Sequence, residues 1–364
     1  MSCPLRTYPL RKPENHRVPV PRWTLRLPDD VTHVHTSYIG VQQHSDTELA
    51  RDASAKAIKS INIWVKELER EDAIVCESFV GITLDDSGEQ DVAVWVCYWI
   101  DSIWAETTLK DFSLLEFQKN IHSTSARDSI GLWLESFSSE VSRLETNYSG
   151  LDYLPGLARL PGTSTKEHTL SAYWGAARDR IPDSAHDLFP KTTDDVPSDP
   201  IPKGLGQHLI GTNVANMVHI RSGQFWENCG QQEADSYERK LEGTLRAGLT
   251  YLHENPKDTN AMSVRYLRNV NDPAQEHERE LKETCGAAFF ANLEDLERWA
   301  HTHQSHLKIY RGAMAHYKAF GDSRRFRTWH EVSVIREGRA RSEYLNCVPE
   351  ERTMLRLEAQ ERRG

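Results

Sequence analysis

Two histidine-bearing segments in the last third of the chain could do chemistry together. His303 and His306 lie in a helix-like pattern, and His330 opens a short run that alternates like a strand. An imidazole can ligate iron, and it can also carry protons near neutral pH. One histidine to hold iron and one for acid–base work would suit a haem enzyme.

The helix-like segment does not by itself say which histidine would bind iron. Apolar residues recur at spacings of three and four between 293 and 317, and Asn292 is a plausible N-cap. His303 lies within the apolar stripe and His306 lies on its flank. A core histidine with satisfied nitrogens is the alternative for either one. No HExxH motif occurs, which argues against a zinc site.

His330 is expected to face inward, because it shares a strand face with Val332 and Val334. An inward imidazole needs a partner or a task. Three polar residues from other parts of the chain are candidate partners: Glu145, Arg180 and Ser222. Each also has a structural explanation, as a solvated charge, a surface ion pair and a turn former respectively.

Composition excludes several classes of protein. The 364 residues carry a formal net charge of −10, so no basic field exists to attract nucleic acid. The longest apolar run, 93–100, is shorter than the ~20 residues of a membrane span. The N-terminus has no apolar secretory segment. The six cysteines form no CxxC or CxxCH, which excludes a zinc ribbon and c-type haem. We expect a cytoplasmic protein with reduced thiols.

The apolar pattern predicts an α+β fold built from two similar halves. Strands are expected at 35–43, 74–84, 91–100, 208–224, 262–270, 286–292, 330–337 and 342–347. Helices are expected around 57–68, 107–120, 125–144, 234–254 and 293–317. The order strand–helix–strand occurs twice, which is the ferredoxin-like plan duplicated in one chain. Two such units can place their sheets face to face as an α+β barrel with helices outside.

The chain divides accordingly into five segments. They are a Pro-rich, irregular N-terminal arm (1–35), a first ferredoxin-like half (36–180), a Pro-rich joint (181–204), a second ferredoxin-like half (205–349) and a C-terminal tail (350–364). Within the first half, residues 85–90 are expected to connect a hairpin.

Several segments, in the same order along the chain, resemble the haem-containing aldoxime dehydratases. The resemblance is strongest in LERWAHTHQSHLKIY (296–310), WHEVSVI (329–335), YLNC (344–347), YWGAARDRIP (173–182) and IRSGQ (220–224), and extends to YIGVQ (38–42) and LETNYSGLDYLPG (144–156). Members of that family are similar in fold to chlorite-dismutase-like proteins. The resemblance therefore implies a duplicated, dimeric-α+β-barrel-type fold with haem b between sheet and helices.

The resemblance also implies a reaction and a role for each candidate residue. The family dehydrates an aldoxime, R–CH=N–OH, to the nitrile R–C≡N plus water, with the substrate bound through nitrogen to ferrous haem. His306 matches the axial haem ligand, which breaks the tie with His303 and places the ligand in the second half. His330 matches the distal catalytic histidine. The remaining matches are Ser222 to the distal serine, Arg180 to the distal arginine and Glu145 to a supporting glutamate. A homodimer is also expected.

The residue types permit that chemistry. Ser222 and Arg180 could hold the oxime hydroxyl, while His330 gives it a proton and then accepts the carbon-bound proton. Glu145 would orient His330 and favour its charged form. The alternatives are another haem enzyme on the same barrel, of peroxidase or chlorite-decomposing type, and a non-catalytic haem carrier or sensor. The sequence leaves open whether the aldoxime is aliphatic or aryl-alkyl.

Overall fold

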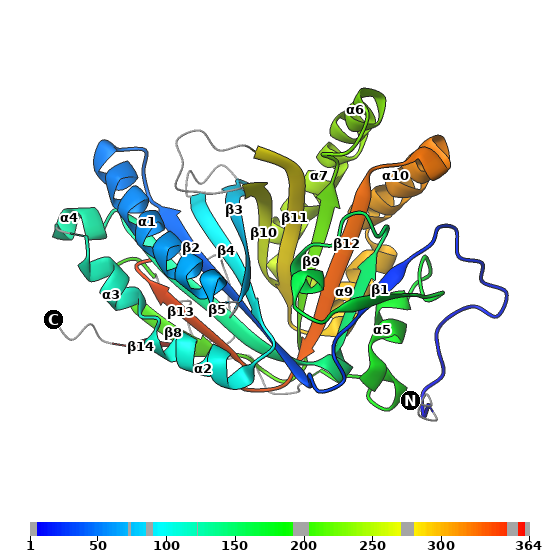
Figure 1. Cartoon of the computed structure of the whole chain (residues 1–364), viewed down its shortest axis with the longest axis horizontal. Coiled ribbons are helices and arrows are strands. Elements are labelled where there is room, and N and C mark those ends of the chain that lie inside the picture. Colours follow the sequence, from blue (N-terminus) through cyan, green and yellow to red (C-terminus); the bar gives the residue numbers. More distant parts are fainter. Residues whose placement is uncertain are drawn as a thin grey trace.

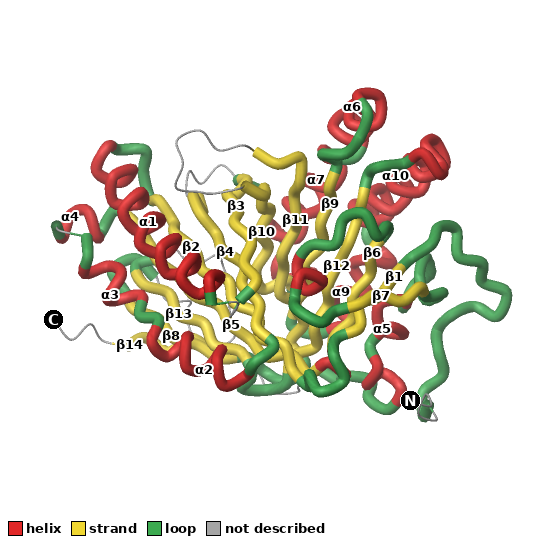
Figure 2. Tube along the Cα trace, viewed as in Figure 1, coloured by secondary structure: helices red, strands yellow, loops and turns green. Residues whose placement is uncertain are grey.

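The strands of the described chain join into one continuous antiparallel sheet (Figure 2). The computed structural model describes residues 6–71, 74–84, 90–121, 123–191, 204–270, 280–347 and 356–360. The strand order is β14-β8-β13-β5-β2-β4-β3-β10-β11-β9-β12-β6-β1-β7. The strands are β1 (Trp23–Arg26), β2 (His33–Gln43), β3 (Val75–Ile82), β4 (Gln90–Trp99), β5 (Ile130–Glu140), β6 (Leu144–Tyr148), β7 (Ser164–Glu167), β8 (His208–Thr212), β9 (Met217–Phe225), β10 (Ala261–Val270), β11 (Glu280–Phe290), β12 (Arg327–Ile335), β13 (Ala340–Leu345) and β14 (Arg356–Gln360).

Helices cover the two outer faces of this curled sheet (Figure 1). They are α1 (Glu48–Arg70), α2 (Ser102–Asp111), α3 (Leu114–Lys119), α4 (Thr124–Arg127), α5 (Ala176–Arg180), α6 (Gln231–Lys240), α7 (Glu242–Glu254), α8 (Pro256–Thr259), α9 (Leu293–Thr302) and α10 (Gln304–Phe320). Helices α1 to α4 lie outside one end of the sheet, and α6, α7, α9 and α10 lie outside the other. Among the described helices, none combines the length and the apolar character needed to cross a bilayer.

The sheet contains two ferredoxin-like units, as the sequence predicts. In each unit four strands pair in the order fourth, first, third, second: β5-β2-β4-β3 in the first unit and β12-β9-β11-β10 in the second. The two units join where β3 pairs with β10. The α+β class and the duplicated ferredoxin-like plan are therefore confirmed.

A repeated packing arrangement marks the duplication in three dimensions. Gly40 on β2 lies opposite Trp133 on β5, and Gly223 on β9 lies opposite Trp329 on β12. A Cβ atom would come within 2.0 Å of the Trp133 ring at Gly40 and within 2.2 Å of the Trp329 ring at Gly223. Each tryptophan therefore requires a glycine across from it, in the equivalent place of each unit.

Each half of the sequence also extends the sheet of the other unit. Strands β6, β1 and β7 continue the second unit beyond β12, whereas β13, β8 and β14 continue the first unit beyond β5. Two strands start inside the arm expected to be irregular, since β1 spans 23–26 and β2 begins at 33. In the Pro-rich joint, 182–185 form a short 3-10 turn and 192–203 lie outside the described residues. So do residues 85–89 of the hairpin connection predicted at 85–90, and most of the C-terminal tail.

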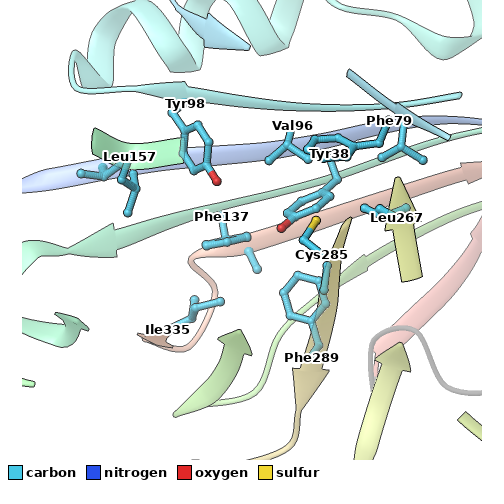
Figure 3. Close-up of a cluster of buried hydrophobic side chains, with 14 of the residues drawn as sticks. Tyr38, Phe79, Val96, Tyr98, Phe137, Leu157, Leu267, Cys285, Phe289 and Ile335 are labelled. Atoms are coloured by element: carbon cyan, nitrogen blue, oxygen red, sulfur yellow. The ribbon is translucent and has the colours of Figure 1, made fainter. Parts of the chain in front are cut away.

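A hydrophobic core fills the space between the two units (Figure 3). Tyr38 and Phe137 from the first unit meet Phe289 and Cys285 from the second, and all four are nearly inaccessible to solvent. The five described cysteines are free thiols. This core fixes the inner faces of β9 and β12, so their other faces are left for the outer helices.

One predicted helix is wrong. Residues 125–144 form the single turn of α4 followed by the strand β5. Strand β5 is an interior strand, paired with β13 on one side and β2 on the other, and side chains on both of its faces are buried, for example Leu132 and Trp133. Burial on both faces removes the alternation of polar and apolar residues by which a strand is recognised.

Three other predicted helices are each divided into two. The segment 107–120 gives α2 and α3, and 234–254 gives α6 and α7. The segment 293–317 divides at His303, whose backbone is extended, into α9 and α10. The apolar spacing continues across that break, so the sequence pattern does not show it.

Candidate active site

Two adjoining cavities of about 310 Å³ each lie between the sheet of the second unit and its helices α7, α9 and α10. We call them together the sheet–helix cavity. Nine residues line both: Asn147, Ala172, Ile220, Ser222, Leu296, Trp299, His306, Tyr310 and His330. Most of the remaining lining is apolar, which is typical of sites for small molecules and cofactors.

A row of polar residues crosses the sheet floor of this cavity. His330 on β12 lies directly opposite Asn147 on β6 and opposite Ser222 on β9. Ser222 in turn lies opposite Gly286 on β11. Directly opposed residues of antiparallel strands point to the same side of the sheet. His330 therefore faces the helices with a polar neighbour on each side.

Glu145 and Arg180 form an ion pair beside His330. Arg180 Nε and Nη2 donate to the two carboxylate oxygens of Glu145 at 2.7 and 2.8 Å. The Nη2 atom also lies 2.7 Å from His330 Nε2, which is 3.2 Å from Glu145 Oε1. Burial alone would raise the pKa of Glu145, but Arg180 and then His330 outweigh it and lower the pKa to about 2. Glu145 is therefore ionised at neutral pH.

The N-terminal arm holds the helix that carries Arg180. Asp179, the preceding residue of α5, accepts hydrogen bonds from the backbone N–H groups of Arg11 and Lys12. Arg180 Nη1 also donates to the carbonyl oxygen of Leu170 at 2.6 Å. These contacts fix the guanidinium from both sides. Four of the predicted site residues thus lie together in space: Glu145, Arg180, Ser222 and His330.

His306 projects into the same cavity from α10, on the side of the helices. Its ring packs edge-on against Trp299 with centroids 4.9 Å apart. Its Nδ1 is buried and has no hydrogen-bond partner among the described residues. Burial lowers the pKa of His306 to about 4, so the imidazole is neutral near neutral pH, the form that ligates metals.

His303, in contrast to His306, caps a helix. It ends α9 and caps α10, with its side chain accepting from the backbone N–H of Ser305. Its ring stacks on Tyr251 at 3.7 Å between centroids. The alternative of a core residue, which the sequence offered for His303, is wrong, because His303 is a half-buried helix cap. It does not line the described cavities, whereas His306 lines both.

The cavity fits a flat apolar group held by one imidazole. On its floor, Gly286 and Ala288 of β11 leave the sheet surface without large side chains. Facing them are the neutral, unpartnered His306 nitrogen and the indole of Trp299. These residues fit a haem, whose iron His306 would hold.

Three residues near the site were not singled out from the sequence: Asn147, His168 and Trp299. Asn147 could have been found, because it lies two residues after Glu145 in a strand and so shares its face. His168 hydrogen-bonds Asn147 through Nε2 at 3.2 Å, but it comes from an irregular part of the chain, where no periodicity places a side chain.

Comparisons with known proteins show which family the chain is similar to. The family model described as haem-containing dehydratase matches residues 37–351. An aliphatic aldoxime dehydratase from Pseudomonas chlororaphis is 28% identical over 351 residues, covering 96% of this chain and 94% of the relative. A phenylacetaldoxime dehydratase from Bacillus sp. (strain OxB-1) is 28% identical over 343 residues, covering 93% and 92%.

Two solved structures are similar over nearly the whole chain. A crystal structure of an aldoxime dehydratase has a TM-score of 0.79 and 27% identity, covering 96% of this chain and 95% of the other. An aldoxime dehydratase in complex with butyraldoxime has a TM-score of 0.78 and 25% identity, covering 95% and 92%. Both likenesses confirm the fold.

Proposed function

The chain belongs to the haem-containing dehydratase family, and on that premise we propose that it converts an aldoxime, R–CH=N–OH, to the nitrile R–C≡N and water. One observation carries the proposal. His330 is held by the Arg180–Glu145 pair on the floor of an apolar cavity, and His306 enters the same cavity from the opposite wall.

In this proposal His306 would hold the iron of a haem b, whose active state would be Fe²⁺. When bound, haem supplies the electron density that weakens the N–O bond of the substrate. The protein contributes a neutral imidazole to hold the iron. The apolar walls exclude water, which strengthens every polar interaction made inside.

His330 moves the protons. As imidazolium it gives its proton to the oxime oxygen, so that the N–O bond breaks and water leaves. The neutral imidazole then accepts the proton from carbon, which completes the triple bond and restores the imidazolium. Glu145 lies 3.2 Å from His330 Nε2 and orients the imidazole, and Arg180 keeps Glu145 ionised and in place. Ser222 and Arg180 hold the oxime hydroxyl for this transfer.

An anaerobic assay tests the proposal. The purified holoprotein is reduced with dithionite and given one alkyl and one aryl-alkyl aldoxime, and nitrile is measured by chromatography. We expect nitrile from at least one substrate, dependent on reduction. Absence of nitrile from both, with haem loaded and reduced, contradicts the proposal. Peroxide-dependent dye oxidation measured in parallel would then favour the peroxidase-type alternative.

Two further expectations belong with this function. A homodimer and a cytoplasmic location are predictions from the sequence and its resemblance. Sedimentation of the purified protein tests the first, because a monomer and a dimer of a 41.7 kDa chain are well separated.

A further inference from the structure

We propose that Asn147 is an additional substrate-binding residue whose side-chain N–H donates a hydrogen bond to the oxime oxygen, and that His168 fixes the direction of that amide. The inference rests on the proposed function and deepens it. It adds a recognition element for the oxygen atom that leaves as water.

The position of Asn147 is the first argument. It lies opposite His330 on the neighbouring strand β6, just as Ser222 lies opposite His330 on β9. It lines both parts of the sheet–helix cavity, and 8% of its surface is exposed. A ligand atom above His330 therefore has Ser222 on one side and Asn147 on the other.

Hydrogen bonding around His168 fixes which end of the amide faces the cavity. The backbone N–H of Leu170 donates to His168 Nδ1 at 3.1 Å. An N–H group can only donate, so Nδ1 must be the unprotonated nitrogen of the ring. The proton of the neutral imidazole is then on Nε2, which lies 3.2 Å from Asn147 Oδ1. The carbonyl end of the amide is thereby committed to His168, and its N–H₂ end is turned elsewhere.

His168 stays neutral under working conditions, which preserves this arrangement. Burial and the positive charge of Arg180 lower the pKa of His168 to about 4. The backbone of Leu170 ties the two sides of the site together, since its carbonyl oxygen accepts from Arg180 while its N–H group donates to His168. The Asn147 donor and the Arg180–Glu145 pair are thus anchored on the same short segment.

The chemical effect follows from the charge that develops on oxygen. As the N–O bond weakens, negative charge grows on the oxygen until His330 protonates it. An oriented amide N–H stabilises that charge without transferring a proton, so the proton balance stays with His330. Asn147 would therefore act in binding and, more strongly, in the bond-breaking step.

Two substitutions of Asn147 test this role in the holoenzyme. Asn147→Asp keeps an oxygen for His168 and removes the donor, whereas Asn147→Leu keeps the shape and removes both. We expect each to lower kcat/KM for butyraldoxime by about 10²-fold, within the range for loss of one oxyanion donor. Butylamine serves as the matched probe, because it offers iron a nitrogen on the same carbon skeleton and has no oxygen. Its affinity, measured by the Soret shift of the reduced protein, should change less than twofold.

His168 is a positioning residue in this scheme, so its substitution should be rescued by another donor. His168→Phe removes the group that orients the amide and should lower kcat/KM by about tenfold, less than the substitutions of Asn147. His168→Gln restores a side-chain N–H toward Asn147 and should recover most of the loss. The Soret spectrum and the thermal midpoint show whether each variant keeps its haem and its fold.

Several outcomes overturn the inference. Equal loss of butyraldoxime turnover and butylamine affinity would show that Asn147 only supports the cavity, as would full activity of either Asn147 variant. If the unmodified holoenzyme made no nitrile, the proposed function would fail separately. Soret titration with the aldoxime and the amine would then still decide whether Asn147 recognises the oxygen.

Discussion

The two sheet–helix layers of this molecule share a topology and differ in what fills them. In the first unit, the third strand β4 presents Trp95, Cys97 and Trp99 to the helices, and all three are completely buried. In the second unit, the third strand β11 presents Gly286 and Ala288 at the floor of the sheet–helix cavity. The first layer, which we call the closed layer, is a packed core. The second layer, which we call the open layer, contains the candidate active site.

The duplicated backbone therefore does not make a binding site by itself. Both layers have four equivalent strands under helices, and the volume of the side chains decides which one remains open. The side chains also decide whether the face of the sheet toward the helices is polar. The fourth strand of the first unit offers Leu132 and Leu134 to its helices, where the fourth strand of the second unit offers His330.

Removing the proposed iron ligand should have the largest effect, because the open layer then loses its haem. We expect His306→Ala to be purified with little or no haem and no nitrile-forming activity, as measured by Soret absorbance per chain. The control is His303→Ala, which should keep haem and lose only about 1 kcal/mol of stability with its helix cap. Loss of haem from His303→Ala instead would reverse the assignment.

Removing the proposed proton carrier should leave haem bound in the open layer and slow the formation of nitrile. His330→Ala should bind haem normally and form nitrile about 10²–10⁴-fold more slowly, the usual contribution of acid–base catalysis. Steady-state nitrile formation, normalised to haem content, measures the effect. Turnover near that of the unmodified protein would remove His330 from the mechanism.

Opening the closed layer should affect stability and not function. Trp95→Ala should lower the free energy of unfolding by about 3–5 kcal/mol, because it leaves a void and removes the indole that donates to Asn62. Haem content and nitrile formation per haem should not change. The matched variant Trp299→Ala, in the open layer, should show the reverse: a smaller loss of stability and a clear change in haem affinity. Chemical denaturation and haem titration compare the two.

The charged groups of the open layer should give it a distinctive pH dependence. Because the pKa of Glu145 falls from 4.5 to about 2 on folding, its ionised form stabilises the native state above pH 4.5. That contribution is on the order of 3 kcal/mol and declines as the pH falls from 4.5 toward 2. Glu145→Gln should lack it, so the stability difference between the two proteins should shrink over that interval. A difference independent of pH would contradict the ion-pair explanation.

The sequence predicts the duplicated class well because apolar periodicity is a local property. The strands around 74–84, 91–100 and 262–270 and the first helix are all present. The prediction fails at 125–144, where burial on both faces of β5 hides the strand pattern. It also misses the break at His303, because the backbone turns there without interrupting the apolar spacing.

The candidate site likewise contains residues that the sequence identifies and residues that it misses. Residue types, spacing and resemblance were enough to select His306, His330, Ser222, Arg180 and Glu145. Asn147 and His168 were missed, because their importance lies in pairing across strands and in a loop that lies against β6. Such contacts depend on register, which a sequence without partners does not specify.

By itself, the sequence determines which segments form strands and helices over most of the chain, and which residues have side chains fit for iron and proton chemistry. Only the tertiary structure brings Glu145, Arg180 and Ser222 around His330 across separations of up to 185 residues, and places His306 facing them. The physical reason is that periodicity reflects local burial, whereas distance between side chains depends on how strands from different halves pair in one sheet. The same pairing decides that one of two equivalent layers is filled and the other is open.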